Sequence, residues 1–309
     1  MIELCTETVN CGICRSSEST ELFVERYSLG GSAADLGIRR CRQCDVVYVS
    51  PRLTVDSTDF VYRFDAEHTI SHNYCWDGST NAKRFAPLLR RLKELAPAGR
   101  LLDVGCGGGH FLAAAKSTGS WEPIGVEPVP SAAKAAREYS QCTIHSSTLQ
   151  DADLPNHSFQ IVTLLGVLEH LHDPVSTLKV ARKLLAPDGV LAVYVPNFNY
   201  LRWKDTGLAA RVRTGRSSKL HPQEHLFQYT PRTLARLLAT SGFALTRTDI
   251  GRPFIHGYVA KRMLKEFAYM AVRALYASTG IHLGGIEAIA SPVDTHQFRE
   301  GNLAQREAA

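Results

Sequence analysis

The sequence lacks the segments that mark membrane proteins and secreted proteins. No apolar run approaches the roughly 20 residues that a membrane-spanning helix requires. The chain starts M-I-E-L-C-T-E, which does not have the basic and then apolar order of a signal peptide. Internal repeats and low-complexity tracts are absent as well. We therefore expect a cytoplasmic protein without a membrane span, present as a monomer or a homodimer.

A strong excess of charge is also missing. The 309 residues carry a formal net charge of +5, which is too small to indicate nucleic-acid binding by itself. Hydrophobic residues make up 44% of the chain and charged residues 21%, which is ordinary for a globular protein with a core. The length allows one large α/β domain with a small addition, or two modest domains.

A glycine-rich turn at residues 101–109, L-L-D-V-G-C-G-G-G, is the most informative stretch. An apolar run precedes it, and the pattern of a helix starts at His110. Such turns bring backbone N–H groups close to a ligand, because glycine has no Cβ. The G-x-G-x-G spacing of Gly105, Gly107 and Gly109 is not the dinucleotide pattern G-x-G-x-x-G. It is not a phosphate loop either, because no lysine follows.

Four of the eight cysteines form two C-x-x-C pairs, Cys11 with Cys14 and Cys41 with Cys44. Each pair can sit on a tight turn that directs two thiolates at one ion, and four thiolates match the coordination of structural Zn²⁺. A closed set of four ligands leaves no open position, so we expect the metal to stabilise a small zinc ribbon over residues 1–52. Coincidental thiols and a redox-active pair are the alternatives.

Residues 81–291 alternate between helical and strand patterns. A helix is predicted over 81–96, and strands after the glycine strand at 124–126, 142–145, 159–165, 190–195, 244–250 and 286–290. The run at 159–165 is apolar throughout, as expected when both faces of a parallel sheet are buried. The pattern predicts a Rossmann-like α/β fold with a doubly wound, mostly parallel seven-stranded sheet.

These motifs together resemble the class I S-adenosylmethionine-dependent methyltransferases. The resemblance rests on the glycine turn, on Glu127 after the second strand, on S-F-Q-I-V-T-L-L-G-V-L-E-H-L-H-D-P at 158–174 and on G-V-L-A-V-Y-V-P-N at 189–197. It is tight over residues 100–197 and loose over 81–250. Gln160 stands where the family pattern has aspartate, outside the cofactor pocket.

The resemblance implies S-adenosyl-L-methionine as the cofactor. The glycines of the turn let the backbone approach its methionine end, and Asp103 faces its amino group. Glu127 binds the ribose, and a carboxylate in this place can accept a hydrogen bond from each ribose hydroxyl.

The resemblance also places the other parts of the cofactor. Thr148 and Leu149, in the loop after the third strand, flank the adenine. Leu165 and Gly166, at the end of the fourth strand, lie next to the sulfonium.

Two histidines are the candidate catalytic bases. Methyl transfer to an oxygen or an acidic carbon releases a proton, and histidine suits the uptake of a proton near neutral pH. His170 follows the fourth strand, and His225 lies in E-H-L-F-Q-Y-T-P. Either can instead be a structural histidine. Glu169 and Glu224 are candidate orienting or metal-binding neighbours.

Less regular segments surround this core. Residues 53–80 are rich in aromatic residues and form a linker or a wall of the pocket. Residues 198–229 form an inserted lid with basic residues at 202–219, which suit an anionic acceptor or a solvated helix. A helix over 257–278 carries an apolar stripe with Phe267 and Met270, which we expect to pack against the domain. A dimer face and a membrane-surface contact are the alternatives. Residues 292–309 form a flexible tail.

We expect an enzyme that methylates a small molecule, such as a sugar, a glycan precursor or a secondary metabolite, at oxygen or carbon. An rRNA or tRNA methyltransferase that binds RNA through the zinc ribbon is an alternative, since that layout also resembles certain ribosomal RNA methyltransferases. The positive charge is concentrated mainly at 202–219. This argues against an RNA substrate, because a protein that binds RNA needs a wide basic face. A non-catalytic scaffold that binds a partner through the ribbon is a further alternative.

Overall fold

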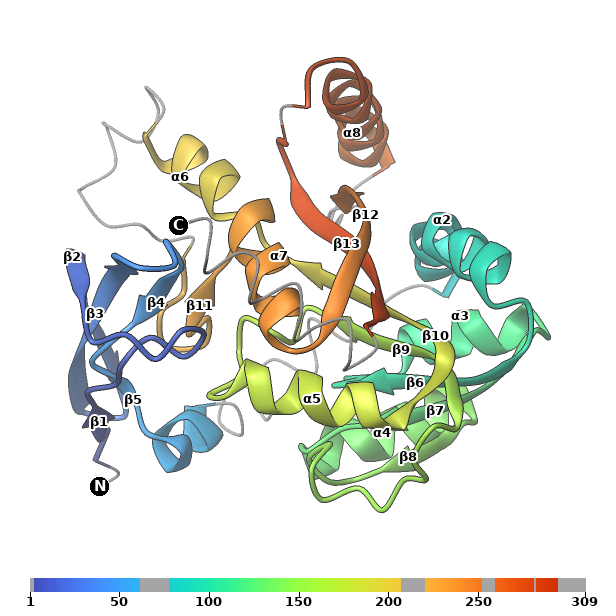
Figure 1. The fold of residues 1–309 in the computed structure, drawn as a ribbon, viewed down its shortest axis with the longest axis horizontal. Helices are drawn as coiled ribbons and strands as arrows, with labels where there is room; N and C mark the ends of the chain where they lie inside the picture. The colour runs from blue at the N-terminus through green and yellow to red at the C-terminus, as the bar shows by residue number, and fades with distance from the viewer. Residues whose placement is uncertain (1–2, 62–77, 207–219, 252–258, 281, 294–309) are drawn as a thin grey trace.

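Two sheets organise the molecule, a small one near the N-terminus and a larger one covered by helices (Figure 1). The structure is a computed structural model, and it describes residues 3–61, 78–206, 220–251, 259–280 and 282–293. Parts of four predicted segments lie outside the described residues, namely 62–77 of the linker, 207–219 of the lid, 257–258 of the helix predicted over 257–278 and 294–309 of the tail.

The small sheet is built around a long hairpin between the two cysteine pairs. Its strands β2 and β3 run antiparallel, and β4 pairs with β3. A separate pair is formed by β1 and β5. The bounds are β1 Thr6–Glu7, β2 Ser19–Leu29, β3 Ser32–Cys41, β4 Val47–Val49 and β5 Arg52–Leu53. The described part of the linker is helical over 55–61.

The large sheet has seven strands in the order β12-β13-β10-β9-β6-β7-β8. Its bounds are β6 Gly99–Val104, β7 Trp121–Val126, β8 Thr143–His145, β9 Phe159–Leu165, β10 Leu185–Val195, β12 Phe243–Gly251 and β13 Gly285–Pro292. Strand β13 is antiparallel to both neighbours, and the other neighbouring strands are parallel. The predicted Rossmann-like sheet of seven strands is thus confirmed.

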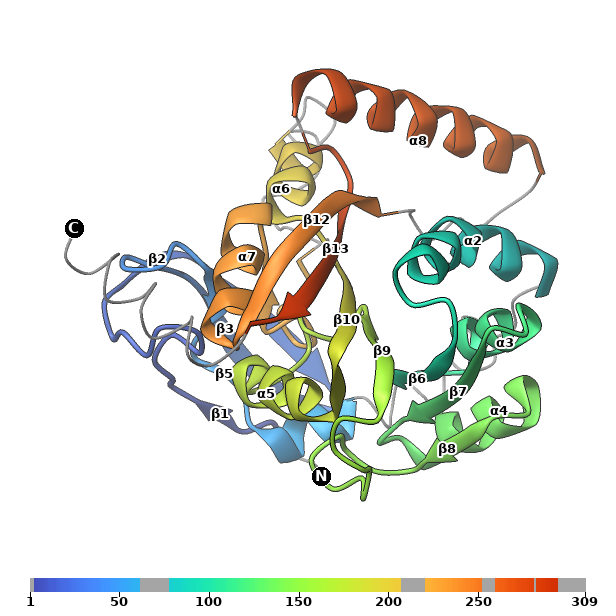
Figure 2. The same ribbon diagram turned by 45° about the vertical axis from the view of Figure 1, so that its right-hand side comes forward.

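Helices cover both faces of this sheet, with α5 and α7 on one face and α2, α3 and α4 on the other (Figure 2). The helices are α2 Gly78–Leu95, α3 His110–Ser117, α4 Pro130–Ser140, α5 Pro174–Leu184, α6 Phe198–Thr206, α7 Pro231–Thr240 and α8 Val259–Thr279. Helix α5 starts at an N-cap, since the Asp173 side chain accepts a hydrogen bond from the Ser176 N–H (3.0 Å). The cap ends the loop that follows β9 and so limits where that loop can run.

The short strand β11 Phe227–Gln228 joins the small sheet from a distant part of the chain. It pairs with β4, so that Phe227 stands opposite Tyr48. The Val49 N–H also donates to the Leu226 carbonyl (3.0 Å). The end of the segment predicted as a lid, 198–229, is therefore part of the sheet of the N-terminal module.

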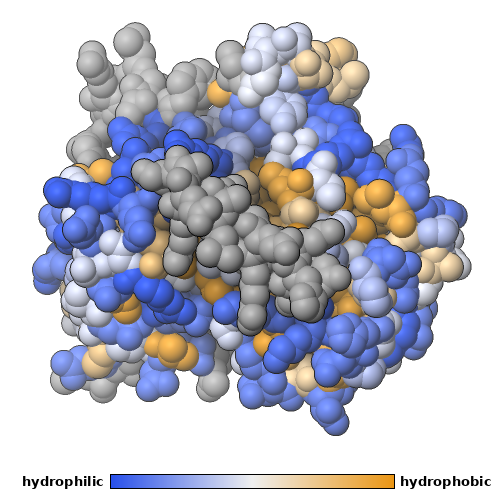
Figure 3. Space-filling model, in the orientation of Figure 1, coloured by the Kyte–Doolittle hydropathy of each residue, from blue (hydrophilic) through white to orange (hydrophobic). Residues whose placement is uncertain are grey.

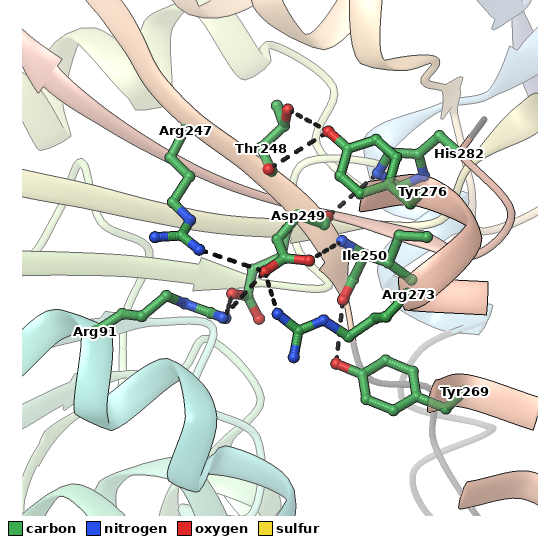
Figure 4. Close-up of polar contacts among 10 residues, drawn as sticks. Arg91, Arg247, Thr248, Asp249, Ile250, Tyr269, Arg273, Tyr276 and His282 are labelled. Atoms are coloured by element: carbon green, nitrogen blue, oxygen red, sulfur yellow. Dashed lines mark hydrogen bonds and ion pairs between the residues drawn. The ribbon is translucent and has the colours of Figure 1, made fainter. Parts of the chain in front are cut away.

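A cluster of buried charges connects α2 and α8 to the edge of the large sheet (Figure 4). Asp249 on β12 lies 3.2 Å from an Arg91 nitrogen and 2.9 Å from an Arg273 nitrogen. Arg91 also pairs with Glu287 on β13. Asp249 and Glu287 are both buried, and each has an arginine partner. The cluster therefore holds α2 and α8 against β12 and β13 through charge-assisted contacts.

The apolar stripe of α8 does not pack against the domain as we expected from the sequence. The helix turns Tyr269, Arg273 and Tyr276 towards β12, where Tyr269 donates to a backbone carbonyl and Tyr276 bonds with Thr248 (Figure 4). Phe267 and Met270 remain 69% and 65% exposed. The arginine needed by buried Asp249 thus decides which side of the helix faces inward. In Figure 3 the surface over α8, at the top, accordingly mixes polar and apolar residues.

No helix in the described ranges combines the length and the apolar character that crossing a bilayer requires.

Candidate cofactor and acceptor site

The glycine turn lies at the carboxyl ends of parallel strands, where open α/β sheets bind their ligands. The φ angles of Gly105, Gly107 and Gly109 are 66°, 51° and 77°, and residues that carry a side chain rarely adopt such values. A Cβ on Gly109 would also lie 2.9 Å from a carbonyl oxygen of α4. The N–H groups of Gly105 and Cys106 donate to the Val126 carbonyl (2.8 and 3.1 Å). The turn is therefore held against β7 and has glycine at the three positions where its backbone takes a positive φ.

Glu127 closes the far side of this turn. Its carboxylate accepts hydrogen bonds from the Gly107 N–H (2.9 Å) and the Val129 N–H (3.0 Å). The side chain is buried, and burial raises its pKa while these two bonds lower it. A buried carboxylate beside a turn whose conformation favours glycine could hold the ribose and methionine ends of S-adenosylmethionine.

Asp103 is a second buried carboxylate at the same edge. It accepts a hydrogen bond from the Thr163 hydroxyl (2.6 Å). Burial raises the pKa of Asp103 to about 7, because one hydroxyl donor only partly replaces water. A cation at this place, such as the amino group of the cofactor, would favour the ionised carboxylate.

The other predicted cofactor residues are spread around this edge. Thr148 is exposed, and its hydroxyl donates to Asp151 (2.5 Å). Leu149 is buried in the core. Leu165 ends β9, and the Gly166 N–H donates to the Tyr194 carbonyl on β10 (2.8 Å).

The two candidate bases lie together, although they are far apart in the sequence. The rings of His170 and His225 meet edge to face, with centroids 4.6 Å apart. Glu169 completes the cluster, since one ligand-type atom of each of the three residues lies within 4.8 Å of the others. We call these three residues the Glu-His-His cluster. Sequence reasoning named each residue separately, and the two E-H pairs, at 169–170 and 224–225, were the available signal.

Burial sets the protonation of the Glu-His-His cluster. Glu169 is 3% exposed, and burial raises its pKa to about 8. Burial lowers the pKa of His170 to about 4, and that of His225 well below its ordinary value. Within the described ranges, no hydrogen-bond donor reaches Oε2 of Glu169 and no partner reaches Nδ1 of His225. The cluster therefore holds polar atoms whose loss of water is not compensated.

The four cysteines of the two C-x-x-C pairs also come together. The sulfur atoms of Cys11 and Cys44 are 3.4 Å apart, and those of Cys14 and Cys41 are 3.5 Å apart. These distances are too long for a disulfide bond of about 2.0 Å. They are near the roughly 3.8 Å edge of a tetrahedron with metal–sulfur bonds of about 2.3 Å. The cluster thus fits a zinc ion.

Contacts connect the cysteine module to the Glu-His-His cluster. Phe227, two residues after His225, packs its ring on the first cysteine turn, where a Cβ on Gly12 would lie 2.6 Å from the ring. The Phe227 N–H donates to the Glu169 carbonyl (3.1 Å). The module therefore helps to position both sides of the cluster.

Residues 79–248, more than half of the chain, match a family model described as a methyltransferase domain. A segment of 101 residues is 36% identical to a ubiquinone biosynthesis O-methyltransferase from Actinobacillus pleuropneumoniae, covering 30% of this chain and 43% of that protein. The chain thus spans less than half the length of the curated relatives it matches.

Solved structures show the same fold. An S-adenosylmethionine-dependent methyltransferase from Mesorhizobium loti superposes with a TM-score of 0.50 at 17% identity, over 67% of this chain and 97% of that one. A second structure is the 1,6-didemethyltoxoflavin-N1-methyltransferase from Burkholderia thailandensis with bound 1,6-didemethyltoxoflavin and S-adenosylhomocysteine. It superposes with a TM-score of 0.51 at 17% identity, over 90% of this chain and 100% of that one.

Proposed function

The chain belongs to the methyltransferase-domain family, and we propose that it transfers a methyl group from S-adenosylmethionine to a small-molecule acceptor. Glu127 carries this proposal, because its buried carboxylate bridges the glycine turn and the residues after β7. Asp103, Thr148, Leu149, Leu165 and Gly166 surround the remaining parts of the cofactor in this proposal. The cofactor supplies a methyl group on a positively charged sulfur, and the residues of the chain bind and orient the two reactants.

The acceptor is proposed to bind beside Gly166, against the Glu-His-His cluster. The names of the curated relatives favour O-methylation of a small molecule over methylation of RNA. In this proposal the acceptor oxygen forms its bond to the methyl carbon as the methyl–sulfur bond breaks. The bonding pair stays on sulfur, and the hydroxyl proton passes to His170 or His225.

The four-cysteine cluster is proposed to hold one structural Zn²⁺. Four thiolates leave no open coordination position, so the metal stabilises the N-terminal module and takes no part in the reaction. Metal analysis of the purified chain is expected to find at least about one zinc per molecule. Absence of zinc, with the thiols reduced, would contradict this assignment.

Calorimetry with S-adenosylhomocysteine tests the enzyme proposal. The wild-type chain is expected to bind it, and Glu127→Ala is expected to weaken binding by roughly 10- to 100-fold, since a hydrogen bond to a charged group contributes about 1.5–3 kcal/mol. Glu127→Gln, which keeps one acceptor oxygen, should lose less. No binding by the wild type would overturn the enzyme proposal in favour of a scaffold. Methylation of RNA but of no small molecule would favour the RNA alternative.

A further inference from the structure

We propose that the Glu-His-His cluster is a binding site for a divalent transition-metal cation that contacts the methyl acceptor. One carboxylate and two imidazoles are a donor set that such cations take in sites with an open position. The inference rests on the proposed methyltransferase function for the place of the acceptor. The site is separate from the four-cysteine cluster and has different ligand atoms.

The ligand atoms of the cluster lie slightly farther apart than they would around a bound cation. Nε2 of His170 lies 3.9 Å from Oε1 of Glu169. Metal–ligand bonds of about 2.0–2.2 Å at a tetrahedral angle place two ligand atoms roughly 3.3–3.6 Å apart, so these two side chains need to close by a few tenths of an ångström. The ligand atom of His225 lies within 4.8 Å of the other two, and its side chain turns towards them to complete the set.

The atoms without partners indicate what is missing from the cluster. A buried carboxylate without a cation or hydrogen-bond donors is costly, and so is a buried imidazole nitrogen without a partner. Oε2 of Glu169 and Nδ1 of His225 are both in this situation within the described ranges. A divalent cation would compensate the carboxylate and one nitrogen of His225 at the same time.

His170 already has the orientation of a metal ligand. Its Nδ1 lies 3.1 Å from the Glu224 carbonyl, and a carbonyl can only accept, so Nδ1 carries the proton. Nε2 therefore carries the lone pair, and it is the atom nearer to Glu169. Metal-binding histidines generally donate their second N–H to a carbonyl or carboxylate, which fixes the ring and makes it a better ligand.

The location connects the cation to methyl transfer. A Cβ on Gly166 would lie 3.7 Å from Oε1 of Glu169, so the cluster adjoins the end of β9. The His170 side chain is 24% exposed, which leaves a route for a ligand. Three protein ligands leave open positions, where a cation favours the ionised form of an acceptor hydroxyl. With the cation bound, both histidines are ligands, so in this form of the site the hydroxyl proton leaves to water instead of passing to His170 or His225.

Titration of the zinc-loaded full chain with Co²⁺, followed by visible absorption, tests the site. The chain is expected to bind one further Co²⁺ with d–d absorption and without thiolate-to-cobalt charge-transfer bands. Glu169→Gln and His225→Gln are each expected to weaken this binding by at least about tenfold. His157→Gln is the control, because His157 is an exposed histidine outside the cluster.

Binding of S-adenosylhomocysteine, measured on the same samples, shows whether each variant is folded and separates the two proposals. Absence of Co²⁺ binding beyond the cysteine site, or Co²⁺ binding that Glu169→Gln leaves unchanged, overturns the cation site. If S-adenosylhomocysteine binds and Co²⁺ does not, the methyltransferase proposal stands without the cation. If Co²⁺ binds and S-adenosylhomocysteine does not, the function fails, and with it the role of the cation in methyl transfer.

Discussion

Two regions of the molecule bury carboxylates, and they differ in whether an arginine pairs with the buried group. At the edge of the large sheet, Asp249 and Glu287 are paired with Arg91, and Asp249 also with Arg273. At the end of β9, Glu169 has two imidazoles beside it and no arginine or lysine partner among the described residues. We call these regions the arginine cluster and, as above, the Glu-His-His cluster.

The difference separates a structural role from a binding role. Removing a carboxylate from water is costly, and an arginine placed by the fold offsets that cost permanently. The arginine cluster is complete within the chain and ties α2 and α8 to the sheet. The Glu-His-His cluster is incomplete within the chain, and a site that needs a ligand is commonly kept at the expense of stability.

Removing Arg91 from the arginine cluster should change the free energy of unfolding more than any other substitution proposed here. Arg91→Leu is expected to destabilise the fold by about 3–5 kcal/mol, because buried Glu287 loses its arginine partner and buried Asp249 keeps only Arg273 at short range. Arg247→Leu is the control, since Arg247 is largely exposed and 3.8 Å from Asp249, and should change stability by less than about 1 kcal/mol. Urea unfolding monitored by circular dichroism measures both. Equal effects would show that the cluster does not support the fold.

Removing zinc should affect the Glu-His-His cluster and spare the arginine cluster. Strand β11 follows His225 and depends on its pairing with β4 of the cysteine module. Amide hydrogen exchange of residues 226–229 is expected to become at least about tenfold faster after zinc removal, as local order is lost. Residues 245–250 of β12 should exchange at the same rate as before. Unchanged protection of both segments would mean that the module is independent of the cluster.

Asp103 gives an intermediate case, a buried carboxylate with one hydroxyl donor. Its pKa of about 7 means that it is mostly protonated at pH 6 and mostly ionised at pH 8. A cationic amino group beside it lowers this pKa, so binding releases a proton and strengthens as the pH rises. Affinity for S-adenosylhomocysteine should therefore rise about tenfold from pH 6 to 8 and level off above pH 7.

Calorimetry at several pH values measures this slope. Asp103→Asn is expected to remove it. A slope that persists in this variant would assign the pH dependence to another group.

The smallest predicted effect is the change in stability when a buried carboxylate is replaced by its amide. We expect this change to have opposite signs in the two clusters. In the metal-free chain, Glu169→Gln is expected to raise stability by about 1 kcal/mol, because it replaces a buried acid without a partner. Asp249→Asn should instead lower stability, since it removes the charge that Arg91 and Arg273 face. Thermal unfolding compares the two variants. A loss of stability in Glu169→Gln would indicate that Glu169 is a structural residue.

The fold of the large sheet was predictable because its signals are local. The alternation of strands and helices, the glycine turn and the position of Glu127 all lie within residues 81–291, and the seven strands formed as expected. The apolar stripe on α8 led to the wrong expectation that this side of the helix packs against the domain. The periodicity of apolar residues contains no information about the pairing of Arg273 with buried Asp249, which turns the other side of the helix inward.

The candidate site was predictable only in part, because its two halves meet through long-range contacts. His170 follows β9, whereas His225 reaches it through the pairing of β11 with the cysteine module. No local pattern around His225 encodes that pairing. For the same reason the sequence indicated two separate bases, and not one cluster with Glu169.

An anomalous difference map from crystals grown with Co²⁺ tests most directly whether the Glu-His-His cluster is completed by a cation. We expect one peak among the four cysteines and a second peak bounded by Glu169, His170 and His225. The arginine cluster should show none. Anomalous signal at the cysteines alone, with the Glu-His-His cluster empty at saturating Co²⁺, would contradict the account.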